Sequence, residues 1–175
     1  KGTVVFRKTF FSLAAAIILM AVATGTMITM FKRGIQSNEE LFNRYYKPFD
    51  APVYREAADE ENPLTVALKY YRAREYRKAV DLLTDTGFPD TLAMQARFFA
   101  AMSCMQLKDY GSAETILENL LKQDIGLITD QTRWYLGLCR LAMENRDGAC
   151  EQFLLLTKSK GLFRINADAI LEEMD

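Results

Sequence analysis

The stretch Tyr76-Arg77-Lys78-Ala79 has two counterparts later in the chain, Tyr110-Gly111-Ser112-Ala113 and Arg146-Asp147-Gly148-Ala149. The alanines that close the three stretches are 34 and then 36 residues apart. Each stretch lies between two segments whose apolar residues recur with helical spacing, which predicts a helical hairpin. A unit that recurs at such a period is typical of repeat proteins, whose neighbouring units stack and bury a shared core. The sequence therefore predicts three stacked helical hairpins over residues 64–158.

Glycine and proline predict where these hairpins end. Gly87 and Pro89 separate the first hairpin from the second, and Gly161 follows the third, because neither residue continues a helix well. A last helix over 163–174 is expected to cap the array, since the end of a repeat stack has to be covered. The helices of the three hairpins are expected at 64–72, 76–83, 91–107, 110–122, 131–144 and 148–158.

The repeats resemble the tetratricopeptide repeat family. The small residues of the family's first helix fall on Ala67, Ala101 and Gly137, and those that open its second helix fall on Ala79, Ala113 and Ala149. The segment Trp134-Tyr135-Leu136-Gly137 is similar to the family's W-x2-L-G start, and Tyr70 fits the first-helix aromatic. Cys104 and Arg140 stand where the second and third repeats would have that aromatic, and the closing proline is absent. The resemblance implies an all-α, tetratricopeptide-like solenoid of about three repeats with a capping helix at 159–175.

The resemblance also implies a binding groove on the concave side, lined by the first helix of each hairpin. Seven apolar residues would face it: Leu68, Tyr71, Phe98, Met102, Met105, Leu138 and Leu141. The Lys, Arg and Asn clamp by which some family members hold a peptide's carboxylate end is absent. An apolar groove exposed to water is unfavourable, by roughly 25 cal/mol per Å². Its occupant is expected to be either the chain itself, through 163–174 or 41–54, or a helix or peptide of a partner protein.

Residues 9–31 carry no charge and lie between Arg7-Lys8 and Lys32-Arg33. A helix of that length would cross the hydrocarbon core of a bilayer, which is roughly 30 Å thick. We therefore expect a flank at 1–8 and a single transmembrane helix at 9–31 that contacts the lipid bilayer.

Two other interpretations of this run remain. It could be a buried helix of a core, although such helices rarely lack a polar face over this length. It could also be a signal peptide with a cleavage site at Ala21-Val22-Ala23. If it spans a membrane, small-xxx-small pairs would allow two anchors to pack as a homodimer; these pairs are Ser12 with Ala16 and Ala21 with Gly25.

Residues 32–63 are expected to form a juxtamembrane linker or lid, since they contain too many aromatic residues for an idle linker. Part of this segment is similar to the region after the membrane helix in proteins of Bacteroidetes-type bacteria: Leu41-Phe42-Asn43-Arg44-Tyr45-Tyr46-Lys47-Pro48-Phe49. The similarity implies a single-pass protein of a bacterial inner membrane, with its N-terminus in the cytoplasm and its repeats in the periplasm.

Composition argues against several classes of function. The 175 residues carry a formal net charge of −1 and include no histidine, so the chain lacks a global field for nucleic acid and the commonest general base and metal ligand. Three cysteines without CxxC spacing predict neither a disulfide framework nor a zinc site; we expect them in the core, although Cys139 and Cys150 could approach each other. No phosphate-binding loop or nucleophile elbow is present. We expect no catalytic, cofactor or metal site.

These observations leave two hypotheses of function. In the first, the chain is a membrane-anchored scaffold or adaptor that recruits a protein partner through its repeats. In the second, it is a constitutive structural subunit of a larger membrane protein complex. Both predict a non-enzymatic protein. They differ in whether the occupant of the groove can be replaced by another protein segment.

Overall fold

The computed structural model describes residues 20, 36–52, 62–84, 87–123, 126 and 128–174. The chain divides into two compact units, residues 1–36 and 37–175. In the first unit only Met20 and Gln36 are described.

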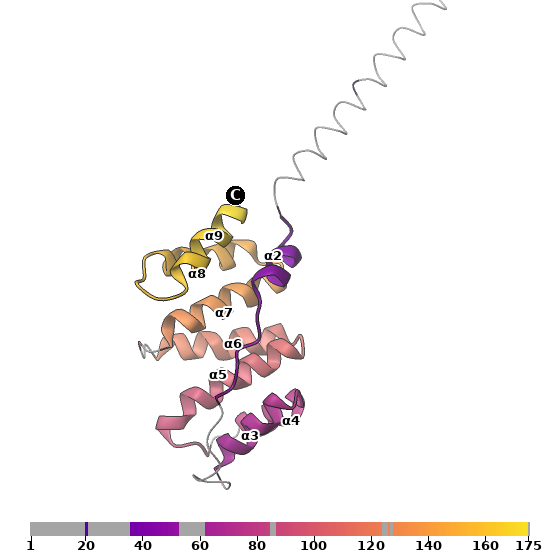
Figure 1. Ribbon diagram of the computed structural model, residues 1–175, viewed down its shortest axis with the longest axis vertical. Coiled ribbons are helices and arrows are strands. Elements are labelled where there is room, and N and C mark those ends of the chain that lie inside the picture. Colours follow the sequence, from indigo (N-terminus) through magenta and orange to yellow (C-terminus); the bar gives the residue numbers. More distant parts are fainter. Residues whose placement is uncertain are drawn as a thin grey trace, which may run out of the picture. The chain divides into compact units, whose positions relative to one another are not determined.

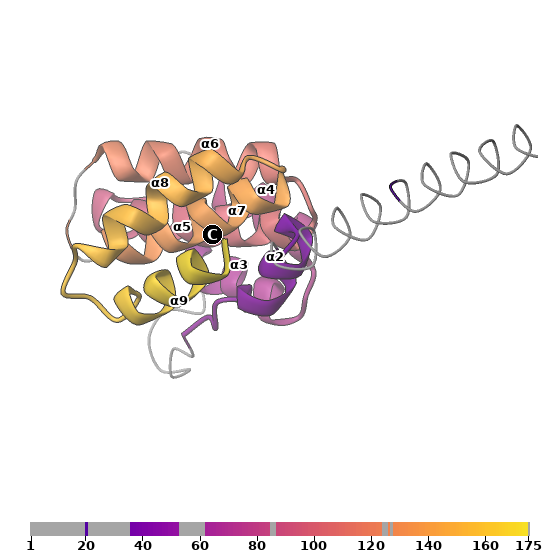
Figure 2. The ribbon, with the colours of Figure 1, turned by 90° about the horizontal axis from the view of Figure 1, so that it is seen from above.

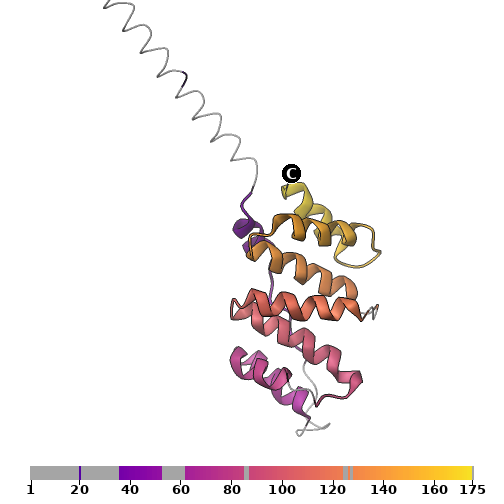
Figure 3. The same cartoon turned by 180° about the vertical axis from the view of Figure 1, so that it is seen from behind.

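The described part of this second unit holds eight α-helices and no strand. Each helix from α3 to α9 packs on the next one in the sequence, so the helices form a stack in chain order (Figures 1 and 3). Seen from above, α4, α6 and α8 lie along one side of the stack and α2 lies on the other (Figure 2). The helices are α2 (Asn38–Tyr45), α3 (Pro63–Arg72), α4 (Tyr76–Leu83), α5 (Asp90–Gln106), α6 (Tyr110–Lys122), α7 (Thr129–Ala142), α8 (Arg146–Thr157) and α9 (Arg164–Met174).

The same turn joins the two helices of every hairpin. Its key residue has positive φ although it is not glycine: Arg74 at 62°, Lys108 at 60° and Glu144 at 60°. In each turn the N–H of the following residue donates to a carbonyl five residues back, as Asp109 does to Cys104 at 2.9 Å. This is the Schellman arrangement that ends a helix. Asp109 and Asn145 then cap the next helix through their side chains.

Small residues lie where the two helices of a hairpin cross. Ala67, Ala79, Ala101, Ala113 and Ala149 are all fully buried. Gly137 of α7 lies against the ring of Phe153 on α8, and a Cβ atom there would be 2.4 Å from the ring carbon Cε1. The helices therefore approach more closely than a larger side chain would allow. We call the side of the stack that α3, α5 and α7 form the inner face, and this packing positions it.

The observed helices begin and end within two residues of the ranges expected from the sequence. The largest differences are in the third hairpin, where α7 and α8 both begin two residues earlier than expected. Such differences are usual at helix ends, which fray and are set by capping.

The membrane part of the predicted fold class has to be corrected. Residues 9–31 lie outside the described residues apart from Met20, and none of the described helices has the length and apolar character needed to cross a membrane. The longest, α5, has 17 residues and includes Asp90 and Arg97, whereas a span takes about 20 mainly apolar residues. In the part of the chain that the structure describes, the fold is thus an all-helical repeat stack. The prediction of a single-pass location in a bacterial inner membrane was wrong on the same finding.

Candidate protein-binding site

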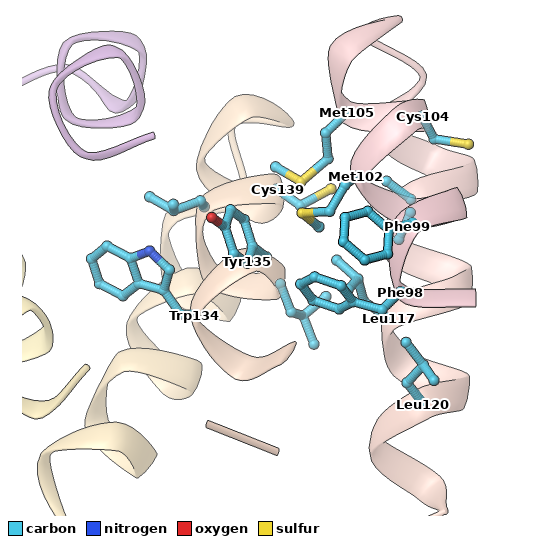
Figure 4. Close-up of a cluster of buried hydrophobic side chains, with 14 of the residues drawn as sticks. Phe98, Phe99, Met102, Cys104, Met105, Leu117, Leu120, Trp134, Tyr135 and Cys139 are labelled. Atoms are coloured by element: carbon cyan, nitrogen blue, oxygen red, sulfur yellow. The ribbon is translucent and has the colours of Figure 1, made fainter. Parts of the chain in front are cut away.

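All seven residues predicted for the groove are buried, at 5% exposure or less. They come from α3, α5 and α7 and belong to one hydrophobic core cluster. Figure 4 shows part of this cluster, where Phe98 and Met102 of α5 face Tyr135 of α7. The prediction that a partner binds these residues stays a prediction, because what covers them in this structure is the chain itself.

Residues 46–52, which we call the strap, contact two of these residues, Tyr71 and Phe98. The strap follows α2, is not helical and lies across the inner face. Three side chains of the stack donate hydrogen bonds to its main chain. The Tyr135 hydroxyl donates to the carbonyl of Lys47 at 2.9 Å and the Tyr71 hydroxyl to that of Phe49 at 2.8 Å. Arg72 donates to the carbonyl of Pro52, also at 2.8 Å. The stack therefore holds the strap by its backbone.

One strap side chain enters the aromatic part of the inner face. The ring of Phe49 meets those of Phe98 and Tyr135 edge-on, with centroids 5.4 and 6.3 Å away, and lies 5.9 Å from Phe99. Such geometry is favourable because the positive edge of one ring faces the negative face of another. The neighbours Lys47 and Asp50 are exposed. Phe49 is thus the anchor of the strap.

Helix α2, which precedes the strap, packs against α7 of the last hairpin and against α9. Leu41 is fully buried, and the ring of Tyr45 meets Trp134 edge-on at 6.1 Å. Arg44 forms a 2.7 Å ion pair with Glu173, and the Tyr45 hydroxyl donates to the same carboxylate at 3.0 Å. Residues 37–52 therefore connect the end of the stack to its first hairpin.

Burial keeps the hydroxyl groups of the inner face protonated. It raises the pKa of Tyr46 to about 12 and also raises the pKa values of Tyr71 and Tyr135, because desolvation disfavours a phenolate. Tyr71 and Tyr135 are hence hydrogen-bond donors over the physiological pH range. The side-chain amide of Gln106 donates a hydrogen bond to the Tyr46 hydroxyl oxygen at 2.6 Å.

Arg140, which stands where the family has an aromatic, ties the second repeat to the third. Its guanidinium donates to Glu114 at 2.9 Å and to Glu118 at 2.6 Å, both on α6, and to the carbonyl of Gly148 at 3.2 Å. Its side chain is only 13% exposed. The departure from the family pattern thus replaces aromatic packing with a polar bridge between repeats.

A separate pocket of about 660 Å³ lies between α4, α5 and α6. It forms where α4 ends at Leu83, whereas α6 continues five residues past the equivalent Leu117. Leu83 and Ile116 are among its apolar lining, and Arg97 and Lys122 are among its polar lining. Asp90 also lines it, so its polar side carries charges of both signs.

The structure brings together few groups that could carry chemistry. Cys104 and Cys139 are buried and Cys150 is partly buried, all three as free thiols, so the bridge considered between Cys139 and Cys150 is not formed. Burial raises the pKa of Cys139 to about 12. Within the described ranges, no group of three or more acidic, Cys or His side chains could hold a metal ion.

Sequence reasoning missed part of the inner face. It did not single out Tyr135 and Arg72, which hold the strap, or Phe99, which packs on it. Tyr135 was within reach, because it lies three residues before the predicted Leu138 and so shares its face of the helix. Arg72 gave no such signal, since its hydrogen bond is to a backbone carbonyl 20 residues away.

Residues 36–120, just under half of the chain, match the model of a protein family described as anaphase-promoting complex, cyclosome, subunit 3. That family is built from tetratricopeptide-like repeats. The match supports repeats of the tetratricopeptide type in this chain. The matched range includes α2, the strap and the helices α3 to α6. Searches of curated proteins and of solved structures returned no match.

Proposed function

We propose that this chain is a non-enzymatic protein-interaction scaffold whose inner face binds an extended segment of polypeptide. Tetratricopeptide-like repeats generally bind protein partners. The observation that carries the proposal is the strap, an extended segment held on the inner face by three hydrogen bonds to its carbonyl groups.

Binding through carbonyl groups suits a peptide site. Every residue offers a backbone carbonyl, so Tyr71, Tyr135 and Arg72 could hold the main chain of many different segments. The bonds are supplied by the two outer repeats, with α5 of the middle repeat packing between them. The inner face therefore resembles a site that recognises an extended chain along its length.

A second candidate function is that of a constitutive structural subunit within a larger assembly. The observation that favours it is that the strap already fills the inner face. A tethered segment acts at an effective concentration of roughly 1 mM, so a partner in solution competes poorly unless it binds much more tightly. The two functions differ in whether a partner segment can replace the strap on the inner face.

Cutting the chain between the strap and α3 tests the proposal. A specific protease site would be inserted between residues 53 and 61 and the folded chain cleaved there. A fluorescent peptide of residues 37–52 would then be added, with a scrambled peptide of the same composition as control. We expect the native peptide to enter the cut chain and the scrambled one to stay free, as measured by anisotropy. If the cut chain keeps its helical circular dichroism but never takes up the peptide, the inner face is permanent core and the structural function is favoured.

A further inference from the structure

We propose that the inner face selects partner segments with an aromatic anchor and that the strap competes with such partners within the same chain. The inference rests on the proposed function, because it names the ligand of the same site. The strap shows the pattern: an aromatic side chain at the position of Phe49, and accepting carbonyls two residues before it, at the anchor itself and three residues after it.

The anchor position is specific because its surroundings are aromatic. Phe49 lies among Phe98, Phe99 and Tyr135, of which each is at most 5% exposed. Phe49 is itself partly buried, so an aliphatic side chain there would lose the edge-to-face contacts and a charged one would lose part of its hydration. At the positions of Lys47 and Asp50 the side chain is exposed. The inner face therefore selects the side chain at one position of a bound segment and accepts different side chains at the positions around it.

The three carbonyl bonds fix the register of a bound segment. Tyr135 lies on α7, and Tyr71 and Arg72 lie at the end of α3, so the segment runs from the last repeat toward the first. A partner shifted by one residue would place its aromatic ring away from Phe98 and Phe99. The partner class is accordingly an extended peptide with a single aromatic anchor, read in one direction.

The strap can leave without the rest of residues 37–52. Helix α2 has its own contacts, through the buried Leu41 and through the bonds of Arg44 and Tyr45 to Glu173. A partner therefore competes only with residues 46–52. For an effective strap concentration of about 1 mM and an intrinsic Kd of about 10 µM for strap and partner alike, the strap weakens partner binding about 100-fold.

The test measures binding of a fluorescent peptide of residues 46–52 to the full chain by anisotropy. Three chains are compared: the unchanged chain, Phe49→Ala, and Lys47→Ala as the matched control, in which only an exposed side chain is shortened. We expect Phe49→Ala to bind the peptide at least 10-fold more tightly than the unchanged chain, because its own strap has lost the anchor. Lys47→Ala should bind like the unchanged chain.

A second set of measurements varies the peptide. A peptide with Phe49→Ala should bind the Phe49→Ala chain at least 10-fold more weakly than the native peptide, and a peptide with Lys47→Ala should bind as the native one does. Equal binding of all three peptides would overturn the aromatic selection while leaving the proposed function in place. Equal binding of the native peptide by all three chains would overturn the competition. If the protease-cut chain takes up no peptide either, the proposed function fails as well.

Folding of each chain is checked by far-UV circular dichroism and by the emission of Trp134, which is 4% exposed and contacts Tyr45 of α2. Should Phe49→Ala not fold, Phe49→Leu replaces it. Leucine keeps an apolar side chain but loses the edge-to-face contacts, so tighter peptide binding is again expected. Unchanged binding by a folded Phe49→Leu chain would count against the inference.

Discussion

Replacing Gly137 by alanine tests whether α7 and α8 cross so closely at this residue that a side chain cannot be accommodated. The added Cβ would be 2.4 Å from Cε1, 2.7 Å from Cζ and 3.0 Å from Cδ1 of the Phe153 ring. Ordinary van der Waals contacts of a Cβ atom lie at 3.4–4 Å, so the ring or the helix has to move by about 1 Å. Phe153 is fully buried and its ring also contacts Trp134, with centroids 5.4 Å apart. The ring therefore has little room to move.

The magnitude follows from two opposing effects. Overpacking a buried site costs about 1–3 kcal/mol, and this clash with a rigid ring on the neighbouring helix belongs at the upper end. Alanine is better than glycine in a helix by about 1 kcal/mol. The expected net loss for Gly137→Ala is about 2 kcal/mol, which lowers the melting temperature of a chain of this size by about 4–8 °C.

The assay is urea and thermal unfolding followed by circular dichroism, with Gly111→Ala as the matched control. Gly111 lies in the first turn of α6 and a Cβ atom there would meet nothing within 4 Å, so this change should stabilise the chain by about 0.5–1 kcal/mol. In a double mutant, Phe153→Leu should recover part of the loss caused by Gly137→Ala, since it removes the obstructing ring atoms. A Gly137→Ala chain as stable as the Gly111→Ala chain would refute the close crossing.

Three further predictions concern the turns, the inter-repeat bridge and the buried hydroxyl groups. Lys108→Gly should stabilise the chain by about 0.5–1 kcal/mol in urea unfolding, because Lys108 is held at φ 60°, a conformation that favours glycine. Arg140→Met should destabilise it by about 1–2 kcal/mol in the same assay, because Glu114 and Glu118 lose their shared partner; no loss would mean that the bridge is only incidental. Stability should fall between about pH 10 and pH 12, because an unfolded tyrosine loses its proton near pH 10 whereas Tyr46 keeps it to about pH 12. The fall should be shallower in Tyr46→Phe, and an equal fall in both chains would count against it.

The helices of the stack were predictable because their signals are local. Gly87, Pro89 and Gly161 ended the helices close to where the sequence placed them, and the spacing of the small residues gave the repeat. The turn at Lys108 was located correctly, but its positive φ was not foreseen because lysine does not favour that conformation.

Which segment covers the inner face was not predictable, because that depends on contacts between residues far apart in the sequence. Tyr135 and Lys47, for example, are 88 residues apart. The apolar residues of this face were predicted to line a groove, and two segments of the chain were considered as its cover. Only contacts distinguish them: α9 packs on α8 as the next helix of the stack, while residues 46–52 lie on the face.

The membrane prediction came from the length of the uncharged run 9–31, the basic residues on both sides of it and the similarity of residues 41–49 to membrane-anchored proteins. An uncharged run such as 9–31 has the length of a span, but none of the described helices has the length and apolar character needed to cross a membrane. The described helices are shorter and carry polar residues, as in α5 with Asp90 and Arg97. The pocket beside α4 was not predicted either. It lies where α4 ends earlier than α6, and the sequence does not show which side chains then line the space.

The most direct test of the central claim is whether the Phe49 ring lies on the inner face in solution. Nuclear Overhauser effects would be measured on the full chain with selectively labelled Phe and Tyr rings, and Phe49→Leu would assign the Phe49 signals. The predicted result is a set of cross-peaks from the Phe49 ring to Phe98 and Tyr135, whose ring centroids lie 5.4 and 6.3 Å away. A Phe49 ring without these cross-peaks, in a chain whose Phe98–Tyr135 contact is intact, would contradict the claim that the strap occupies the inner face.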